Sequence, residues 1–276
     1  MSYKKILTIQ DISCVGQCSL TVALPILSAC GMETCILPSA VLSTHTAGFS
    51  GFTVRDLTDD IPGIQRHWQK ENIKFSAIYT GYLGSTKQID YVKNILETMG
   101  TEDCVRVVDP AMADNGNLYP AFDAAYVEAM KVLCGCADIL IPNITEACFL
   151  ADTEYKDTYD ITYIEDLLQK LVALGAKTVV LTGVSYTAGK TGVVVYENSN
   201  MAYYEHNKIA KGCHGTGDVY ASAFTGALMN GKSVFNAAKI AADYTLKCIL
   251  NTQAHPDHWY GAMFETALRD LIDMVK

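Results

Sequence analysis

A glycine-rich stretch in the last quarter of the chain, Gly215-Thr216-Gly217-Asp218, has the residue types that hold an anion beside a base. The glycines leave the backbone free to curl with its N–H groups pointing one way. The small and apolar residues 219–229 predict a helix whose dipole is positive at its first turn. Asp218 would lie in that turn as a base next to the anion, as phosphoryl transfer requires. A glycine turn before a capped helix is the alternative, because short glycine motifs are weak evidence.

The composition indicates which class of protein this is and which binding partners are excluded. Of the 276 residues, 50% are hydrophobic and 18% are charged, which is typical of a globular protein and not of a disordered one. The formal net charge is −9, and no cluster of Lys and Arg extends beyond Lys4-Lys5, which argues against a nucleic-acid partner. Any phosphate bound here must therefore be held by local groups and a divalent metal.

The cysteines and the first residues indicate the compartment. The 10 cysteines lie mostly in apolar runs and none forms a Cys-x-x-Cys pair, as expected of reduced core residues in a cytosolic protein. The first apolar run, 6–9, is too short for a signal peptide, and no apolar run reaches the ~18 residues of a membrane span. We expect a soluble, cytoplasmic protein with no membrane partner, folded as one domain over residues 1–276.

Alternating strands and helices must position the reactive residues. Short apolar runs predict strands, and segments with helical periodicity separate them, such as 164–174, which ends at Gly175. A hairpin is expected at 192–204. The predicted parallel strands are 6–10, 34–37, 75–80, 105–108, 139–141 and 178–182. This pattern predicts an α/β fold with a central, mostly parallel sheet and helices on both faces, in three α/β/α layers.

Polar residues stand at or just after the ends of the predicted strands. In parallel sheets, ligands bind at this carboxyl edge. The residues are Asp11, in a loop expected at 11–16, followed by Tyr82, Asp109, Asn143, Glu146 and Thr182. A chance distribution would place some of them at the opposite edge, so their common position favours an anion site that includes the glycine-rich stretch.

Two acidic positions could bind a metal. Asp109 and the pair Asn143-x-x-Glu146 offer hard oxygen ligands, which suit Mg²⁺ bound to phosphates better than a softer metal. Helix capping by Asn143, with Glu146 as a partner of the helix dipole, is an equally open alternative. The local sequence does not decide between the two.

The histidines and the long connections allow further expectations. His45 and His214 have no partner at metal-ligand spacing, which favours hydrogen-bonding roles. The His-Pro-Asp-His tract at 255–258 is expected to be a solvated loop. Residues 39–58, with their glycine-aromatic run, are expected to form a functional loop or flap, and 113–120 a polar connection.

Over essentially its whole length, the chain resembles the pyridoxal/pyridoxamine (vitamin B6) kinases of the ribokinase-like superfamily. The residues on which this resemblance is based are Gln10, 43–46 (Ser-Thr-His-Thr), 80–84 (Thr-Gly-Tyr-Leu-Gly), 108–112 (Val-Asp-Pro-Ala-Met), 142–146 (Pro-Asn-Ile-Thr-Glu) and 214–218 (His-Gly-Thr-Gly-Asp). The resemblance implies a ribokinase-like fold and ATP-dependent phosphorylation of the 5′-hydroxymethyl group of pyridoxal, pyridoxamine or pyridoxine, in vitamin B6 salvage. It also implies Mg²⁺, allows a monovalent cation such as K⁺, and implies a homodimer paired through the edge of the sheet.

The resemblance also implies roles for individual residues. Asp218 would be the base for the substrate hydroxyl, with the anion hole formed by Gly215, Thr216 and Gly217. The pyridine pocket would be lined by Asp11, Thr46 and Tyr82. The residues implied on the ATP side are Asn143, Glu146, Thr182, Lys211 and Gly212, with Glu146 also serving the metal. The connection 113–120 would be a lid over the phosphates.

Two features leave the substrate open. Gln10-Asp11-Ile12-Ser13 stands where pyridoxal kinases usually carry Gln-Ser-His, and is closer to the start of hydroxymethylpyrimidine kinases. Those kinases, however, commonly carry Cys where this chain has Asp218, and the turn at 81–84 favours the B6 branch. Hydroxymethylpyrimidine kinase and a non-catalytic nucleotide- or vitamin-binding protein are therefore alternatives. A sugar kinase would need a larger β lid, for which the segment after Cys30 leaves little room.

Overall fold

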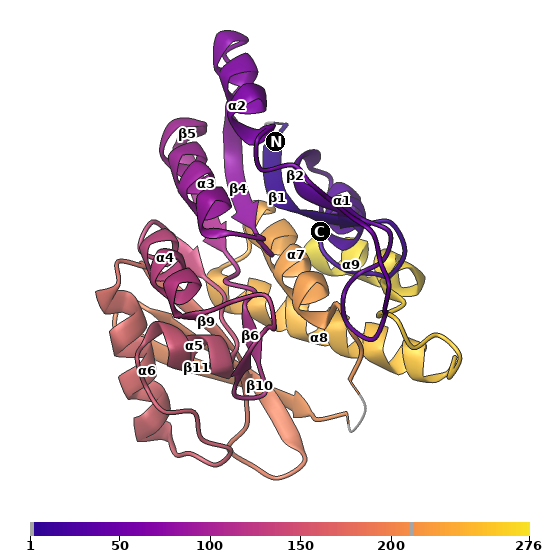
Figure 1. Ribbon diagram of the computed structural model, residues 1–276. Helices are drawn as coiled ribbons and strands as arrows, with labels where there is room; N and C mark the ends of the chain where they lie inside the picture. The colour runs from indigo at the N-terminus through magenta and orange to yellow at the C-terminus, as the bar shows by residue number, and fades with distance from the viewer. Residues whose placement is uncertain (1–2, 210–211) are drawn as a thin grey trace.

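Figure 1 shows the computed structural model, in which residues 3–209 and 212–276 are described. The strands are β1 (Lys5–Ser13), β2 (Glu33–Leu42), β3 (Val54–Asp56), β4 (Phe75–Thr80), β5 (Gly100–Val108), β6 (Ala113–Asp114), β7 (Asn117–Leu118), β8 (Ile139–Leu140), β9 (Thr178–Val184), β10 (Lys190–Glu197) and β11 (Asn200–Asn207). The helices are α1 (Leu20–Ala29), α2 (Ile61–Lys70), α3 (Thr86–Thr98), α4 (Ala124–Cys134), α5 (Ile144–Leu150), α6 (Ile161–Ala173), α7 (Thr216–Met229), α8 (Val234–Gln253), the 3₁₀ helix η1 (Phe264–Ala267) and α9 (Leu268–Val275).

The described strands form a nine-stranded sheet in the order β11-β10-β9-β8-β5-β4-β1-β2-β3, and β6 and β7 form a separate hairpin. The central strands from β9 to β2 all pair in parallel, whereas β3, β10 and β11 are antiparallel additions at the edges. The prediction of a mostly parallel sheet is therefore confirmed. Pairing of two copies through an edge of this sheet stays a prediction.

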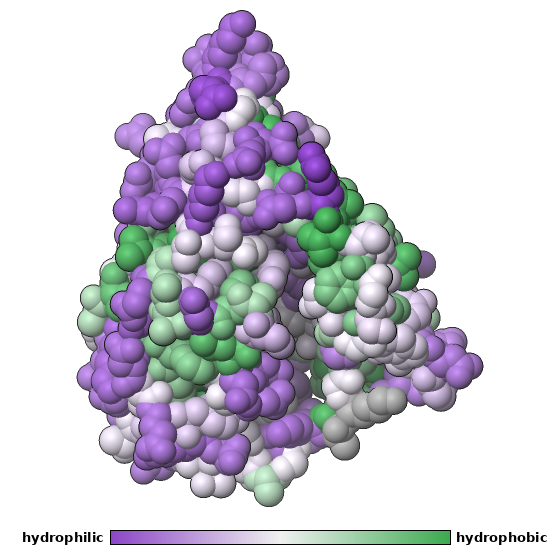
Figure 2. All heavy atoms as spheres, viewed as in Figure 1, coloured by the Kyte–Doolittle hydropathy of each residue, from purple (hydrophilic) through white to green (hydrophobic). Residues whose placement is uncertain are grey.

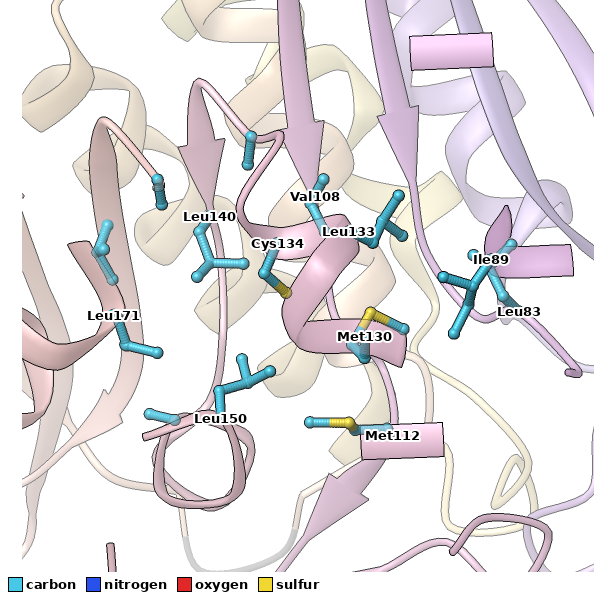
Figure 3. Packing of buried hydrophobic residues seen from close by; sticks show 14 of the residues in the cluster. Leu83, Ile89, Val108, Met112, Met130, Leu133, Cys134, Leu140, Leu150 and Leu171 are labelled. Atoms are coloured by element: carbon cyan, nitrogen blue, oxygen red, sulfur yellow. The ribbon is translucent and has the colours of Figure 1, made fainter. Parts of the chain in front are cut away.

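Helices cover both faces of the sheet because successive strand residues point to opposite sides. In β9, Val179 and Leu181 join a hydrophobic cluster with α2 to α6, whereas Val180 joins a second cluster with α1, α7, α8 and α9. Figure 3 shows part of the first cluster, with Leu140 of β8 facing Cys134 of α4. The two clusters make the three-layer fold that the sequence predicts. Within the described ranges, no helix combines the length and hydrophobicity needed to cross a membrane.

Strand β1 is longer than the sequence indicates. It continues to Ser13, so Asp11 belongs to a strand and not to the loop expected at 11–16. The strand continues because it keeps pairing with β2 across a register shift between Gln10 and Ile12. At this shift Asp11 has no partner in β2, and the pairing that resumes at Ile12 and Ser13 keeps Asp11 within the strand.

The two long connections are also more ordered than expected. The flap predicted at 39–58 is shortened to a loop at 43–53, because β2 extends to Leu42 and pairs with β3. The connection predicted at 113–120 contains the β6–β7 hairpin. Its turn, Asn115-Gly116, has positive φ at both residues, which is the conformation that two-residue hairpins prefer.

Substitution of a glycine in α7 can test how closely this helix packs on α1, with a glycine in α2 as the comparison. A Cβ on Gly226 of α7 would lie 2.4 Å from the Cys30 sulfur, whereas a Cβ on the exposed Gly63 of α2 would come no closer than 3.9 Å to Arg66. We expect Gly226→Ala to lower the free energy of unfolding by about 1–3 kcal/mol through overpacking. Gly63→Ala should instead raise it by about 0.5–1 kcal/mol through helix propensity. Urea titrations measure both, and an undiminished stability of Gly226→Ala would contradict the close α1–α7 contact.

Candidate active site

The glycine-rich stretch forms the beginning of α7, as the sequence predicts. Gly215 precedes the helix with a φ of 75°, and a Cβ at this position would lie 1.9 Å from the Gln17 carbonyl oxygen, so only glycine fits. No side chain among the described residues caps this helix end. The N–H groups of Thr216, Gly217 and Asp218 are therefore available to an anion at the positive end of the helix dipole.

Asp218 lies in the first turn of α7 and is partly buried. Its pKa is raised from 3.8 to about 7, because burial disfavours the charged form more than a hydrogen bond from the Ser19 backbone favours it. The nearby Asp11 carboxylate adds to the increase. A carboxylate that titrates near neutral pH, beside a helix end that can bind an anion, has the properties of a general base.

Asp11 and Tyr82 lie at the ends of β1 and β4, where the strand order reverses and where α/β sheets bind ligands. Asp11 is 5% exposed, and its Oδ2 accepts a hydrogen bond from the Ser13 hydroxyl at 3.1 Å. Burial raises the pKa of Asp11 against the hydrogen bonds from Ser19 and Ser13. Burial and the charge of Asp11 also raise the pKa of Tyr82, so the phenol and the carboxyl are close enough to interact.

His45 is the flap side chain that lies near Asp11. It is buried, and its Nδ1 accepts a hydrogen bond from the Ala47 N–H at 3.2 Å. Its Nε2 lies 2.5 Å from the Tyr260 carbonyl oxygen and must donate, which fixes the neutral Nε2–H tautomer. The predicted hydrogen-bonding role of His45 is confirmed. The neighbouring Thr46, predicted to line the ring pocket, is exposed on the same loop.

The segment after α8 packs on the flap. The prediction of a solvated loop at 255–258 is wrong for His258, whose Nε2 lies 2.9 Å from Gln17 Oε1. The next residue, Trp259, packs against Phe49 of the flap with ring centroids 4.7 Å apart. These contacts join segments that are far apart in the sequence, so no local pattern could have indicated them.

Helix α5 begins with a capping box. Asn143 Oδ1 accepts a hydrogen bond from the Glu146 N–H at 2.9 Å, and Glu146 Oε2 accepts one from the Asn143 N–H at 2.8 Å. The capping interpretation is thus confirmed. The same side chains also hold the start of the β6–β7 hairpin: Glu146 Oε1 accepts from the Met112 N–H, and Asn143 Nδ2 donates to the Ala113 carbonyl. Because a carboxylate oxygen has two lone pairs, capping leaves Glu146 able to bind a metal.

Asp109 and Glu146 bring two buried carboxylates together at the ends of β5 and β8. Burial raises the pKa of both, and repulsion from Glu146 and Asp218 raises that of Asp109 further. A divalent cation would relieve this repulsion, and Mg²⁺ is commonly held by one or two carboxylates together with phosphates. The two residues fit such a shared site. Within the described part of the chain, no group of three or more His, Cys, Asp or Glu could hold a metal alone.

A cavity of about 450 Å³ lies beside α5 and the β6–β7 hairpin, and Figure 2 shows the face hollowed beside that hairpin. Asn143 and Thr182, both predicted to contact ATP, line this cavity. Thr145 of the motif at 142–146 also lines it, as do side chains that the sequence did not single out: Tyr155, Tyr159, Tyr186 and Lys208. They come from separate segments and share no local motif. Of the other predicted ATP contacts, Gly212 is exposed and Lys211 lies outside the described residues.

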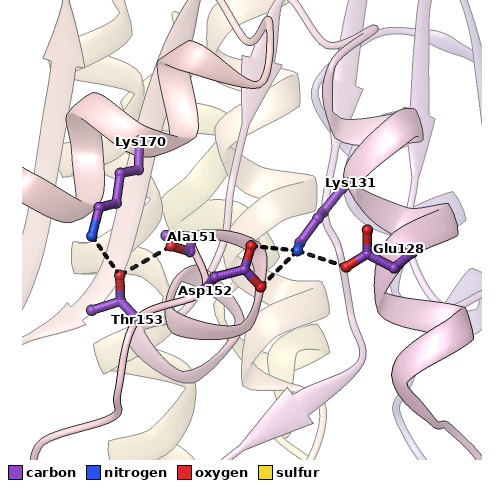
Figure 4. Close-up of polar contacts among 6 residues, drawn as sticks. All are labelled: Glu128, Lys131, Ala151, Asp152, Thr153 and Lys170. Carbon is purple, nitrogen blue, oxygen red and sulfur yellow. Dashed lines mark hydrogen bonds and ion pairs between the residues drawn. The ribbon is translucent and has the colours of Figure 1, made fainter.

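The far end of α5 is fixed to both neighbouring helices, as Figure 4 shows. Lys131 of α4 lies 2.7 Å from the carboxylate of Asp152, which follows α5. Lys170 of α6 donates to the Thr153 hydroxyl at 3.0 Å. Such solvent-accessible contacts each contribute little free energy. Together they orient a helix of only 7 residues, whose first turn supplies the capping box.

An uncapped helix end, a partly buried base and paired buried carboxylates are the parts that phosphoryl transfer uses. A model of the phosphomethylpyrimidine kinase family matches residues 24–263. The chain belongs to the phosphomethylpyrimidine kinase family. This membership makes it a kinase, and it confirms the phosphotransferase activity predicted from the glycine-rich stretch.

Solved structures place this family member in the ribokinase-like fold. A candidate phosphomethylpyrimidine kinase from Bacteroides thetaiotaomicron, crystallised with pyridoxal, is 37% identical, with a TM-score of 0.92, covering 98% of this chain and 96% of that chain. The pyridoxal kinase from Lactobacillus plantarum is 31% identical, with a TM-score of 0.91, covering 99% and 98% of the two chains. The hydroxymethylpyrimidine/phosphomethylpyrimidine kinase of Bacillus subtilis (strain 168) is 25% identical over 219 residues, 78% of this chain and 77% of that enzyme. The chain is therefore similar to kinases named for two different substrates.

The raised pKa of Asp218 predicts how the stability of this kinase depends on pH. The folded state binds this proton more tightly than the unfolded state, so the stabilising contribution is complete below about pH 4 and is lost as pH rises through about 7. Asp218→Asn has no such proton to lose. We expect the Tm of the variant minus that of the wild type to increase by several degrees between about pH 5 and pH 8.

Thermal melts at a series of pH values measure this difference. Asp90→Asn, which changes an exposed carboxylate on α3, is the control and should show a constant difference from the wild type. The same constant difference for Asp218→Asn would contradict the burial of the Asp218 charge.

Proposed function

We propose that the chain is a vitamin B6 kinase, which transfers the terminal phosphoryl group of ATP to the 5′-hydroxymethyl group of pyridoxal, pyridoxamine or pyridoxine. The proposal rests on the position of Asp218, a base with a pKa of about 7 at the uncapped end of α7. The charge of the nearby Asp11 contributes to this raised pKa. The similarity to the Lactobacillus pyridoxal kinase and to the Bacteroides protein solved with pyridoxal supports the B6 branch.

Asp218 accepts the proton of the substrate hydroxyl while the hydroxyl oxygen attacks the terminal phosphorus of ATP. The bond between that phosphorus and ADP breaks, and the N–H groups of Thr216 and Gly217 donate hydrogen bonds to the phosphoryl oxygens, where charge develops. Asp11 and Tyr82 hold the ring of the substrate on the other side of the base. In this mechanism Asp218 transfers the proton, and the backbone of α7 stabilises the developing charge.

The phosphates of ATP occupy the cavity beside α5, where Asn143, Thr182 and Lys208 form part of the wall. Asp109 and Glu146 would hold Mg²⁺ together with these phosphates. The ion would supply positive charge near the transferred group, in addition to Lys208 in the cavity wall, and a chain with a net charge of −9 needs this charge in order to bind ATP.

Phosphorylation of a hydroxymethylpyrimidine is the second candidate function. The family match and the name of the Bacillus relative favour it, as does the Asp11-Ile12-Ser13 sequence after Gln10. Both substrate classes are nitrogen heterocycles with a hydroxymethyl group, so the same base and anion site would serve either. Binding of a vitamin without turnover is the third candidate, but binding alone has no need for a buried base.

The substrate proposal is tested with Mg-ATP and a panel of pyridoxal, pyridoxamine, pyridoxine and hydroxymethylpyrimidine. We expect the substrate with the highest kcat/KM to be a B6 vitamer. Asp218→Asn should lower kcat by roughly 10²- to 10⁴-fold with little change in vitamer binding. Asp90→Asn again serves as the control. Turnover of the pyrimidine alone would assign the second function, and near-wild-type turnover of Asp218→Asn would remove this residue from the mechanism.

Substitutions of Asp11 test whether this residue lines the pyridine pocket. An ionised carboxylate only accepts hydrogen bonds, so we expect it to pair with the protonated ring nitrogen or with the ammonium of pyridoxamine. Asp11→Ser should lower kcat/KM by roughly tenfold or more for pyridoxal or pyridoxamine. Asp11→Asn, which keeps an acceptor oxygen but not the charge, separates the charge from the hydrogen bond. Unchanged activity of Asp11→Ser on both vitamers, with an unchanged thermal melt, would show that Asp11 supports only the strand end.

A further inference from the structure

The tip of the β6–β7 hairpin borders the cavity proposed to hold the phosphates. Asp114 and Asn115 both line that cavity, and Asn115 begins the two-residue turn. A hairpin with strands of two residues each has few hydrogen bonds of its own. Contacts with the rest of the protein must therefore decide where its tip lies.

Two side chains outside the hairpin contact this turn. The hydroxyl of Thr145, the second residue of α5, accepts a hydrogen bond from the Gly116 N–H at 3.1 Å, and Thr145 is 3% exposed. The ring of Tyr155 lies against the same glycine, because a Cβ on Gly116 would come within 3.0 Å of Tyr155 Cδ1. Tyr155 in turn packs on the hydrophobic cluster below α5. We call Thr145 and Tyr155 the hairpin seat.

The first turn of α5 holds the hairpin at both ends. Asn143 and Glu146 bind its start through the backbone of residues 112 and 113, and Thr145 binds its tip. The hydrogen bonds at the start are shared with the capping box, so they persist as long as α5 persists. The bond of Thr145 is the contact that fixes the tip, which is the end next to the cavity.

We propose that Thr145 and Tyr155 are positioning residues for phosphoryl transfer, and that they seat the Asn115-Gly116 turn so that the hairpin closes over the phosphates of a bound nucleotide. The inference rests on the proposed kinase function. Both side chains also line the cavity, but the role proposed for them is to hold Gly116 and not to contact the reacting atoms. A closed hairpin excludes water from the transferred group, so the property that the seat protects is transfer to the substrate hydroxyl and not to water.

Thr145→Val keeps the shape of the side chain and removes the acceptor, whereas Thr145→Ser keeps the hydroxyl. We expect Thr145→Val to lower kcat about three- to tenfold and to raise the fraction of ATP that is hydrolysed without phosphorylated product. Thr145→Ser should leave both quantities close to their wild-type values. Thr98→Val is the control, since it removes a hydroxyl at the end of α3 that accepts a hydrogen bond from Gln65 and does not line the cavity. Coupling of hydrolysis to transfer that is the same in Thr145→Val as in the wild type would overturn the proposal.

Hydrogen exchange in the nucleotide-free protein provides a readout that needs no substrate. Exchange at the Gly116 amide should be about three- to tenfold faster in Thr145→Val and in Tyr155→Ala, but not in Tyr155→Phe, which keeps the ring. Faster exchange in a protein that phosphorylates none of the alcohols would refute the proposed function while supporting the seat. Unchanged exchange in both Thr145→Val and Tyr155→Ala would refute the seat, whatever the protein phosphorylates.

Discussion

Negative charge buried at one edge of the sheet is the constraint on which the rest of this structure depends. Asp11, Asp109, Glu146 and Asp218 all lie there, and none of them takes part in the ion pairs found within residues 3–209 and 212–276. Their support comes from the Ser13 and Ser19 hydroxyls and from backbone N–H groups that include those of residues 19, 111, 112 and 143. Carboxylates held in this way keep raised pKa values, and they favour a ligand that brings its own cation.

The fold meets this constraint with short, firmly supported elements. The parallel order of the central strands carries the ends of β1, β4, β5, β8 and β9 to the same edge, so the acidic residues converge without long loops. Strand β8 has only 2 residues, and α5 has only 7, yet α5 is held at its first turn by the capping box and at its far end by Lys131 and Lys170. Rigid support of this kind keeps like charges close together when they would otherwise separate.

The sequence predicts the parts of the site that depend on local chemistry. A glycine before a helix and the Asn-x-x-Glu pattern act within a few residues, so the uncapped start of α7 and the capping box of α5 could be expected from the residue types alone. The extension of β1 through Asp11 depends on pairing with β2, and the wall formed by Tyr155 depends on the packing of distant segments. Contacts of this second kind leave no periodic or compositional signal in the chain, which is why the flap and the loop at 255–258 were predicted less well.

The contacts of the carboxyl-terminal segment have a consequence for synthesis. His45 and Tyr260 are 215 residues apart, and Gln17 and His258 are 241 apart, so segments from early and late in the sequence meet beside the flap. The sheet is complete once residue 207 has been made. A nascent chain can therefore pack its layers while His45 still lacks the carbonyl that fixes its tautomer. The contacts of His45 and Gln17 with this segment form only after residues 258–260 have been made, so this region of the protein is completed later than the sheet.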